Sequence, residues 1–311
     1  MKKLLNVTLT LLLLGLLAAC ENSMEEKTQS GARGSQEEAL EYSEAVPVEG
    51  ALAEPEAEGE AWSLELPAVE RQLLFDAEKV KITVKEGQLQ TDVLGDVVIP
   101  VLVENNGDTP IDLYIDNVAV NGLTLDLYDV LTLNCDAAAG ESKDGEITIS
   151  ADALESSEIR TISELAVDVM VVRESGGDLV EEDKEIKTSL SGKFEQSVNT
   201  DGKVLYDQDG VKFVVREQIS ETEYGPAVVF YFENNSDQFL SINIDEPVLI
   251  NGREMEHHFN MELKAGAKCI KEDVYQGQEA PIKSLTFQIY GEDAEFMGEV
   301  LIPPFKVNLD F

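Results

Sequence analysis

The feature that most constrains this chain is that its second half repeats its first. Four landmarks recur in the same order, roughly 120 to 131 residues apart, and such an order is hard to produce by chance. The paired segments are Leu74-Phe75-Asp76 and Leu205-Tyr206-Asp207, Glu104-Asn105-Asn106-Gly107-Asp108 and Glu233-Asn234-Asn235-Ser236-Asp237, Val120-Asn121-Gly122 and Ile250-Asn251-Gly252, and the set Ile162, Leu165, Val167, Val169 with Ile282, Leu285, Phe287, Ile289. The sequence therefore predicts two copies of one domain.

Each copy consists of short runs of Val, Ile, Leu, Tyr and Phe separated by Gly, Asn, Asp and Ser, which indicates an all-β fold. A copy of about 110 to 120 residues has room for seven or eight strands, which suits two antiparallel sheets packed face to face. We predict β-sandwich 1 over residues 71–190, a linker over 191–203 and β-sandwich 2 over 204–311.

Local signals refine this prediction. Asn-Gly is the preferred pair for a type I′ turn, so we expect a hairpin at Asn121-Gly122 and at its repeat. The segments Val97 to Val103 and Ala227 to Phe232 are apolar on both faces, which is typical of central strands. One short helix is expected over Ala151 to Glu155, with Ser150 as its N-cap.

The N-terminus carries the pattern of a secretion signal. Lys2-Lys3 precede about 14 mostly apolar residues, and small residues then occupy the positions before a cleavage site. About 20 apolar residues are needed to span a bilayer, so we expect this segment to be removed.

Leu17-Ala18-Ala19-Cys20 resembles the lipobox of bacterial lipoproteins. The resemblance implies cleavage after Ala19, so that residues 1–19 are a lipoprotein signal peptide and Cys20 carries the lipid. Two or three acyl chains anchor a protein durably. The expected location is therefore extracytoplasmic, on the bacterial cell membrane and facing the wall or exterior. An ordinary signal peptide with a chance cysteine is the alternative.

The net charge of the chain limits the classes of partner that it can bind. Sixty-two acidic side chains oppose 23 basic ones, and the formal charge of −39 becomes −39 − 2 = −41 when Lys2 and Lys3 leave with the signal. A nucleic-acid partner requires basic patches, so we expect none. Residues 20–70 are rich in Glu, Ala, Gly and Pro and are predicted to form a disordered tether. Trp62, Leu64 and Leu66 near its end either dock on the first domain or form a chance apolar cluster.

Both repeats together resemble the tandem immunoglobulin-like domains of surface lipoproteins of Gram-positive bacteria. The Cys, Trp, Cys core of antibody-type domains is absent, because Trp62 lies outside both copies and each copy has a single cysteine. Cys135 and Cys269 therefore form no disulfide within a domain. They are either isolated buried thiols or a bridge between the domains.

Motifs with a chemical mechanism are scarce. His257 and His258 are adjacent, and neighbouring residues of a strand point to opposite faces, so they do not suit one metal ion. The segment Asp207-Gln208-Asp209-Gly210 resembles the start of a calcium loop, but the distal glutamate is missing and an Asp-Gly turn fits better. We predict no catalytic residues, no metal site and no cofactor.

The strand around Tyr231 provides the candidate binding face. Val228, Phe230 and Phe232 alternate toward the core, which leaves Tyr231 beside Val229 on the opposite face. An exposed aromatic at this position would belong to a ligand face or to the contact between the domains, while half-exposed sheet residues are the plain alternative.

Two functions from different classes follow from these observations. The first is a non-enzymatic, lipid-anchored cell-surface module that binds or displays, with a surface protein or a wall polymer as partner. The second is an accessory docking subunit of an envelope transporter or a cell-wall enzyme complex. An enzyme is the weakest of the three interpretations, because no catalytic motif is present.

Overall fold

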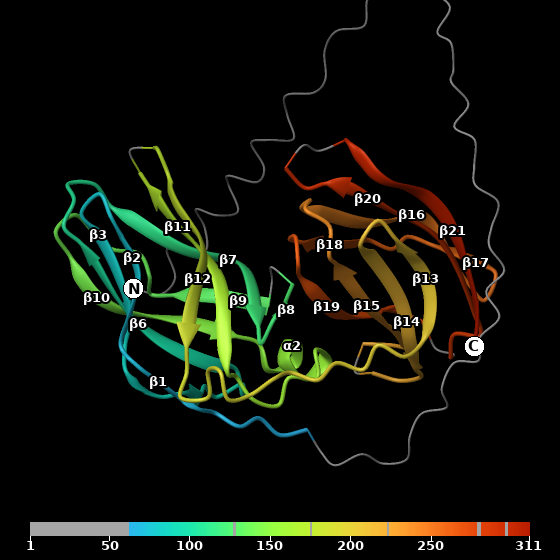
Figure 1. Ribbon diagram of the computed structural model, residues 1–311, viewed down its shortest axis with the longest axis horizontal. Coiled ribbons are helices and arrows are strands. Elements are labelled where there is room, and N and C mark those ends of the chain that lie inside the picture. Colours follow the sequence, from blue (N-terminus) through green and yellow to red (C-terminus); the bar gives the residue numbers. More distant parts are fainter. Residues whose placement is uncertain (1–61, 127–128, 175, 223, 279–280, 296–297) are drawn as a thin grey trace, which may run out of the picture. The chain divides into compact units, whose positions relative to one another are not determined.

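Strands make up most of both repeats in the computed structural model (Figure 1), which describes residues 62–126, 129–174, 176–222, 224–278, 281–295 and 298–311. All of these residues fall within one compact unit, Tyr42–Phe311. Among them, no helix has the length and hydrophobicity that crossing a bilayer requires. The predicted cleavage site, Ala19, and the predicted lipid site, Cys20, lie outside the described residues, as does most of the predicted tether.

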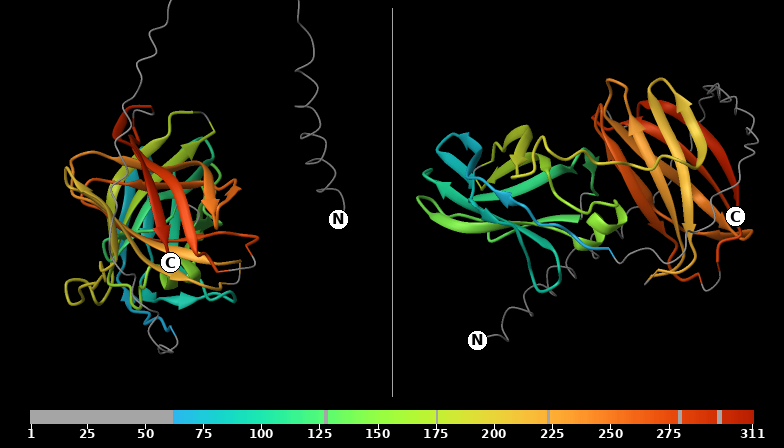
Figure 2. Two further views of the ribbon diagram at one scale, coloured as in Figure 1. Left: turned by 90° about the vertical axis from the view of Figure 1, so that its right-hand side faces the viewer. Right: turned by 60° about the horizontal axis from the view of Figure 1, so that its bottom comes forward.

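The first sandwich has two antiparallel sheets (Figures 1 and 2). One has the order β2-β3-β6-β10-β9, with β5 also pairing with β6. The other, β12-β11-β7-β8, continues through β19 (Lys268–Val274) into the second sandwich, so the two sandwiches share one eight-stranded sheet. The strands are β2 (Gln72–Ala77), β3 (Val80–Val84), β5 (Gln90–Thr91), β6 (Val97–Asn105), β7 (Ile111–Val120), β8 (Leu123–Thr124), β9 (Val130–Leu133), β10 (Ser142–Ile149), β11 (Glu164–Arg173) and β12 (Leu179–Lys187).

The second sandwich repeats this arrangement. One sheet has the order β13-β14-β15-β19 and the other β17-β16-β20-β21, with β18 also pairing with β16. The strands are β13 (Lys203–Gln208), β14 (Val211–Ile219), β15 (Ala227–Asn234), β16 (Leu240–Ile250), β17 (Arg253–Met255), β18 (Phe259–Leu263), β19 (Lys268–Val274), β20 (Ser284–Asp293) and β21 (Val300–Asp310).

The strand order is that of an immunoglobulin-like fold. Strands β3, β6, β10 and β9 correspond to A, B, E and D of one sheet, and β12, β11, β7 and β8 correspond to G, F, C and C′ of the other. Strand β2 is an addition ahead of A. The prediction of two tandem immunoglobulin-like β-sandwiches is confirmed.

The two copies differ in where the fourth strand, D, pairs. In the first sandwich β9 pairs with the E strand β10, whereas in the second β18 pairs with the C strand β16 of the opposite sheet. The E strand β19 therefore loses its D neighbour. Leu123 of β8 pairs with Lys268 at one end of that edge, which links sheets of the two sandwiches.

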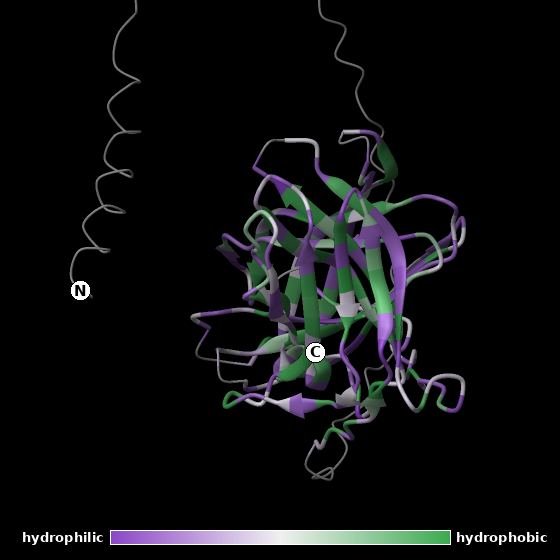
Figure 3. Ribbon diagram, turned by 90° about the vertical axis from the view of Figure 1, so that its left-hand side faces the viewer, coloured by the Kyte–Doolittle hydropathy of each residue, from purple (hydrophilic) through white to green (hydrophobic). Residues whose placement is uncertain are grey.

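Hydrophobic and hydrophilic residues alternate along many of the strands (Figure 3). The hydrophobic ones that are buried form the two cores. Strand β6 alternates buried and half-buried residues, while β15 is buried on both faces over Ala227–Phe232. Both lie inside their sheets, as predicted. Strand β15 is buried on both faces, unlike β6, because the first sandwich covers the outer face of β15.

The repeated Glu-Asn-Asn motif has the same structural role in both copies. The side-chain amide of Asn105 lies 2.9, 3.1 and 3.0 Å from the carbonyls of Thr109, Ala137 and Ala138. The amide of Asn234 lies 2.8, 2.9 and 3.1 Å from three equivalent carbonyls, those of Gln238, Leu263 and Lys264. Both side chains are buried, and each satisfies one buried carbonyl, that of Ala137 or Leu263, and ties two part-buried carbonyls beside it.

The predicted hairpins form at both Asn-Gly pairs. Asn121 and Gly122 have φ of 52° and 81°, and Asn251 and Gly252 have φ of 51° and 76°, as a type I′ turn requires. The Asn121 carboxamide oxygen also accepts the N–H of Ser163 at 2.8 Å, and that of Asn251 accepts the N–H of Lys283 at 2.7 Å. Each turn is thereby tied to the segment that leads into strand F.

Helix α2 (Ala151–Ser156) matches its prediction with one additional residue. The Ser150 hydroxyl accepts the N–H of Ala153 at 3.4 Å and acts as the N-cap. The Asp96 carboxylate accepts the N–H of Ala151 at 2.9 Å. These contacts fix the helix on the first sandwich.

The first domain begins earlier than the predicted boundary at residue 71. Ala68–Val69 forms β1, which pairs with β4 (Gly87–Gln88). Trp62 donates from its indole nitrogen to the Ile159 carbonyl at 3.2 Å, and it packs on the first core with Leu64 and Leu66. The apolar cluster docks because its side chains cover core residues, so residues 62–70 belong to the domain and not to the tether.

The connection between the sandwiches follows the first domain. Strand β12 ends at Lys187 and β13 begins at Lys203. Val198 packs on the first core, and the Gln196 side chain receives a hydrogen bond from Asn121 at 3.3 Å. This segment is a docked extension within the described structure.

We expect Asn234→Ala to lower the free energy of unfolding by about 1 to 3 kcal/mol, because the buried Leu263 carbonyl loses its donor. Urea unfolding of the full chain measures the change. Asn106→Ala, at an exposed position of the same motif, is the matched control. Equal stability of the two variants would contradict the role given to Asn234.

Candidate binding cleft between the sandwiches

Tyr231 and Val229 lie in the joint between the sandwiches. They are 1% and 5% exposed, and with Val214 and Ile270 they belong to the core cluster of the first sandwich. The interpretation of Tyr231 and Val229 as an open ligand face is therefore corrected to the other possibility, the contact between domains. The reason is burial: the first sandwich covers the outer face of β14, β15 and β19.

Ion pairs surround this apolar contact. Lys264 contacts Asp168 at 2.8 Å and Asp183 at 3.1 Å, both on the first sandwich. Burial acts to lower the pKa of Lys264, but its hydrogen bonds to the two carboxylates raise that pKa above its usual value. The ammonium charge is thus held in place by the joint.

Two further pairs cross the joint. Arg216 of β14 donates to Glu158 at 2.6 Å, and its side chain is buried. Lys271 of β19 pairs with Asp126, which follows β8. Partly buried pairs of this kind are less screened by salt than exposed ones.

A cleft of about 520 Å³ opens beside the Lys271–Asp126 pair. Its walls come from both copies: β7, β8 and the residues after β8 on one side, and β16, β18, β19 and β20 on the other. The lining residues are Asp116, Asn117, Thr124, Leu125, Asp126, Asn243, Ile244, His258, Phe259, Asn260, Met261, Glu262, Lys271 and Tyr290. The volume lies in the range of about 300 to 1,000 Å³ that ligand sites occupy.

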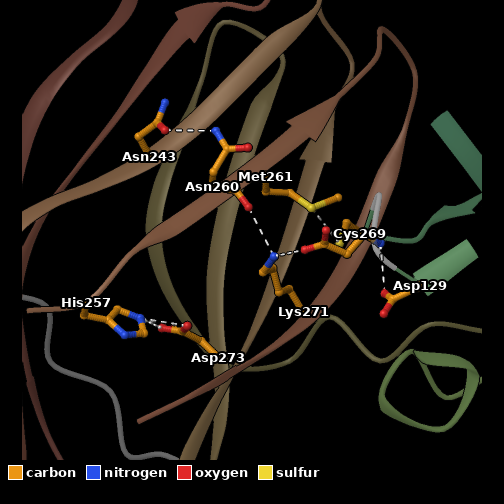
Figure 4. A network of polar contacts seen from close by, with 9 residues as sticks. Asp129, Asn243, His257, Asn260, Met261, Cys269, Lys271 and Asp273 are labelled. Atoms are coloured by element: carbon orange, nitrogen blue, oxygen red, sulfur yellow. Dashed lines mark hydrogen bonds and ion pairs between the residues drawn. The ribbon is translucent and has the colours of Figure 1, made fainter. Parts of the chain in front are cut away.

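Side-chain amides form an ordered polar surface in this cleft (Figure 4). The Asn260 amide donates to the Asn243 side-chain oxygen at 2.9 Å and to the Ser241 hydroxyl at 2.9 Å. Lys271 donates to the Asn260 carbonyl at 3.1 Å and lies 5.2 Å from the centre of the Phe259 ring. The cleft therefore presents fixed donors and acceptors beside an aromatic ring.

Negative charge is in excess at the same place. Burial raises the pKa of Glu262, and the nearby carboxylates of Asp116 and Asp126 raise it further. A second cleft, of about 830 Å³, shares Leu125, Asp126, Met261 and Lys271 with the first. The two clefts therefore meet at the Asp126–Lys271 pair.

The two histidines are directed to different surroundings. The His257 ring nitrogen lies 2.9 and 3.0 Å from the two carboxylate oxygens of Asp273. The centres of the His257 and Tyr275 rings are 4.6 Å apart, with the ring planes tilted by 31°. His258 instead lines the cleft. In the part of the chain that the structure describes, no three His, Cys, Asp or Glu side chains are placed to hold a metal ion.

The other candidates have structural roles. Asp209 and Gly210 have φ of 52° and 82° and connect β13 to β14, so the Asp207 segment forms a hairpin turn. Cys135 and Cys269 are buried free thiols. Burial raises the pKa of Cys269 to about 12, which makes its thiolate scarce.

The sequence did not single out the cleft residues. Asn243 and Asn260 are ordinary outward-facing strand positions in the sequence, and Tyr290 and Lys271 carry no motif. The pairing of Asn243 with Asn260 across β16 and β18 brings the amides together. This pairing depends on the strand β18 joining the sheet of β16, which no local pattern indicates.

Comparison with known proteins gives matches among solved structures alone. No protein-family model matches the chain, and no curated protein does. Among solved structures, the Salmonella enterica SafA pilin in complex with the SafB chaperone is 13% identical, with 68% of this chain and 89% of that chain covered and a TM-score of 0.21. The Acinetobacter baumannii CsuC–CsuE chaperone and tip subunit complex is 13% identical, with 68% and 90% covered and a TM-score of 0.22. The YadV chaperone is 9% identical, with 68% and 92% covered and a TM-score of 0.21. The immunoglobulin-like assignment rests on the strand order described above.

Tyr231→Ser should destabilise the protein by about 3 to 5 kcal/mol, because it removes a buried aromatic side chain from the joint. Chemical denaturation followed by circular dichroism measures this loss. Tyr224→Ser, at an exposed position, is the control and should change stability by less than about 0.5 kcal/mol. A small loss for both variants would show that the joint does not depend on Tyr231.

Glu262→Gln should stabilise the protein at neutral pH. A carboxyl with a raised pKa in the folded state binds more protons when folded, so stability falls as pH rises from the ordinary value of 4.5 through the raised one. The advantage of the variant should therefore disappear below pH 4.5. Urea unfolding at several pH values measures it, with Glu182→Gln on the exposed face of β12 as the control. A constant difference at all pH values would contradict the electrostatic explanation.

Proposed function

We propose that the protein is a non-enzymatic binding module displayed outside the cytoplasm and held on the bacterial membrane by a lipid on Cys20. The observation that carries this proposal is the cleft between the sandwiches, which is built from both copies and lined with ordered amides, carboxylates and an aromatic ring. Such a mixture of polar groups and apolar wall is characteristic of ligand sites.

The joint supports a binding role because it makes the cleft a defined surface. Buried apolar side chains and three sets of ion pairs connect the sandwiches. A binding site held by packed elements loses less entropy on association than a flexible one. The acidic stalk predicted by the sequence would hold this site away from the bilayer.

A second candidate function, an accessory docking subunit of an envelope transporter or cell-wall enzyme complex, is favoured by the turn before β6. Val93 is 100% exposed and Leu94 is 79% exposed. The Asp92 carboxylate accepts the N–H groups of Leu94 at 2.8 Å and Asp96 at 3.0 Å, which fixes the turn. Two aliphatic side chains on a fixed turn suit insertion into a pocket of a partner protein.

Lipid labelling and cross-linking on intact cells test the proposal. Wild type should incorporate labelled palmitate and remain in the membrane fraction, while Cys20→Ala should not. Cross-linking should recover a wall polymer or surface protein, and recovery should fall when Asn260 and Tyr290 are both changed to Ala. An unlabelled wild type would remove the anchor, and turnover of an envelope substrate by the purified protein would overturn the non-enzymatic assignment.

The same experiment separates the two candidates. A stoichiometric membrane protein among the cross-linked products, lost in Val93→Ser with Leu94→Ser but kept in the cleft variant, supports the docking subunit. A cross-linked product that is lost in the cleft variant but kept in the variant of Val93 and Leu94 supports the binding module.

A further inference from the structure

Strand β19 has one side that is only partly paired among the described residues. It pairs with β15 over its whole length on one side. On its other side, its pairing among the described residues is limited to Lys268 with Leu123. The outward N–H and C=O groups beyond Lys268 therefore have no strand partner in the described structure, and an edge of this kind accepts an added strand.

The first sandwich shows what normally occupies this position. There the equivalent E strand, β10, pairs with the D strand β9 over Val130–Leu133. In the second sandwich the D strand β18 pairs with β16. Within the described residues, this strand position is therefore filled beside β10 and, beyond Lys268, unfilled beside β19.

The cleft of about 830 Å³ lies along this free edge. One wall is formed by β19, from Cys269 to Glu272 and at Val274. The opposite wall includes α2 and the residues after it, from Asp152 to Glu158, together with Leu125 and Asp129. The free strand edge therefore faces an open space of ligand size.

The charge of the cleft selects the chemistry of the occupant. Its described lining contains many carboxylates and one basic side chain, Lys271. The carboxylates are Asp126, Asp129, Asp152, Glu155, Glu158, Glu217, Glu221 and Glu272. Lys271 is already paired with Asp126. Burial raises the pKa of Glu272, and the charges of Glu155, Asp152 and Glu217 add to that rise, so a cationic partner would relieve repulsion among these groups.

We propose that the free edge of β19 binds an extended peptide segment carrying Lys or Arg side chains, by addition of a strand to the sheet of the second sandwich. Backbone hydrogen bonds to β19 supply the pairing, and the carboxylates of the cleft receive the basic side chains. The inference rests on the proposed binding function and names its partner class: a basic segment of a protein.

Hydrogen exchange on the full-length protein tests the inference. The probe is an end-blocked octapeptide of alternating valine and lysine. It should slow amide exchange in the segment from Cys269 to Val274, because the outward N–H groups become paired. The control peptide has proline in place of each valine and keeps all four lysines. Proline has no N–H and interrupts strand pairing, so this peptide should give much less protection at the same charge.

Variants test the charge component. Glu155→Gln combined with Glu272→Gln should weaken peptide binding about tenfold, since two carboxylates of the cleft lose their charge. Glu182→Gln combined with Glu254→Gln removes the same charge from exposed strand positions and should change binding less than about twofold. Thermal unfolding is the check that both double variants are folded. The proline peptide tests the wild type independently of these variants.

Binding without protection of β19, equal binding of the proline peptide, or equal loss in both double variants would overturn the inference, because each indicates attraction to the acidic surface alone. If the peptide fails while cross-linking still recovers a cleft-dependent ligand, the proposed binding function stands without the strand addition. If the peptide does not bind and cross-linking recovers no cleft-dependent ligand, both the strand addition and the proposed binding function are wrong.

Discussion

The burial of one face of the second sandwich against the first is the constraint on which the rest of the structure depends. Tyr231, Val229 and Ile270 are part of the first core although they belong to the second copy. A single immunoglobulin-like sheet exposes its outer face to water, whereas here that face is covered by a neighbour. This burial explains why β15 is apolar on both sides and why the two copies form one unit.

The joint also uses cations that are scarce in this chain. Against 62 acidic residues there are 23 basic ones, and Lys264, Lys271 and Arg216 of the second copy all pair with carboxylates of the first. High net charge opposes compaction through self-repulsion. Placing opposite charges across the joint offsets that repulsion where the two acidic halves approach each other.

The sequence was sufficient for features that each copy determines alone. The repeated landmarks, the hairpins at Asn121 and Asn251 and the helix after Ser150 all follow from local chemistry, and each is found in the structure. The pairing of β18 was not predictable, because alternation of apolar residues specifies a face and not a partner strand. The docking of Trp62 depends on a surface formed by distant residues, so its sequence left both interpretations open.

The displaced D strand links the two clefts physically. By joining β16, β18 brings Asn260 beside Asn243 and builds the amide surface of the smaller cleft. By leaving β19, it opens the strand edge that faces the larger one. Residues Met261 and Lys271, on β18 and β19, line both clefts. One change in strand pairing between two copies of the same domain therefore gives the second copy a cleft and a partly unpaired strand edge, whereas at the equivalent strand of the first copy β9 already pairs with β10.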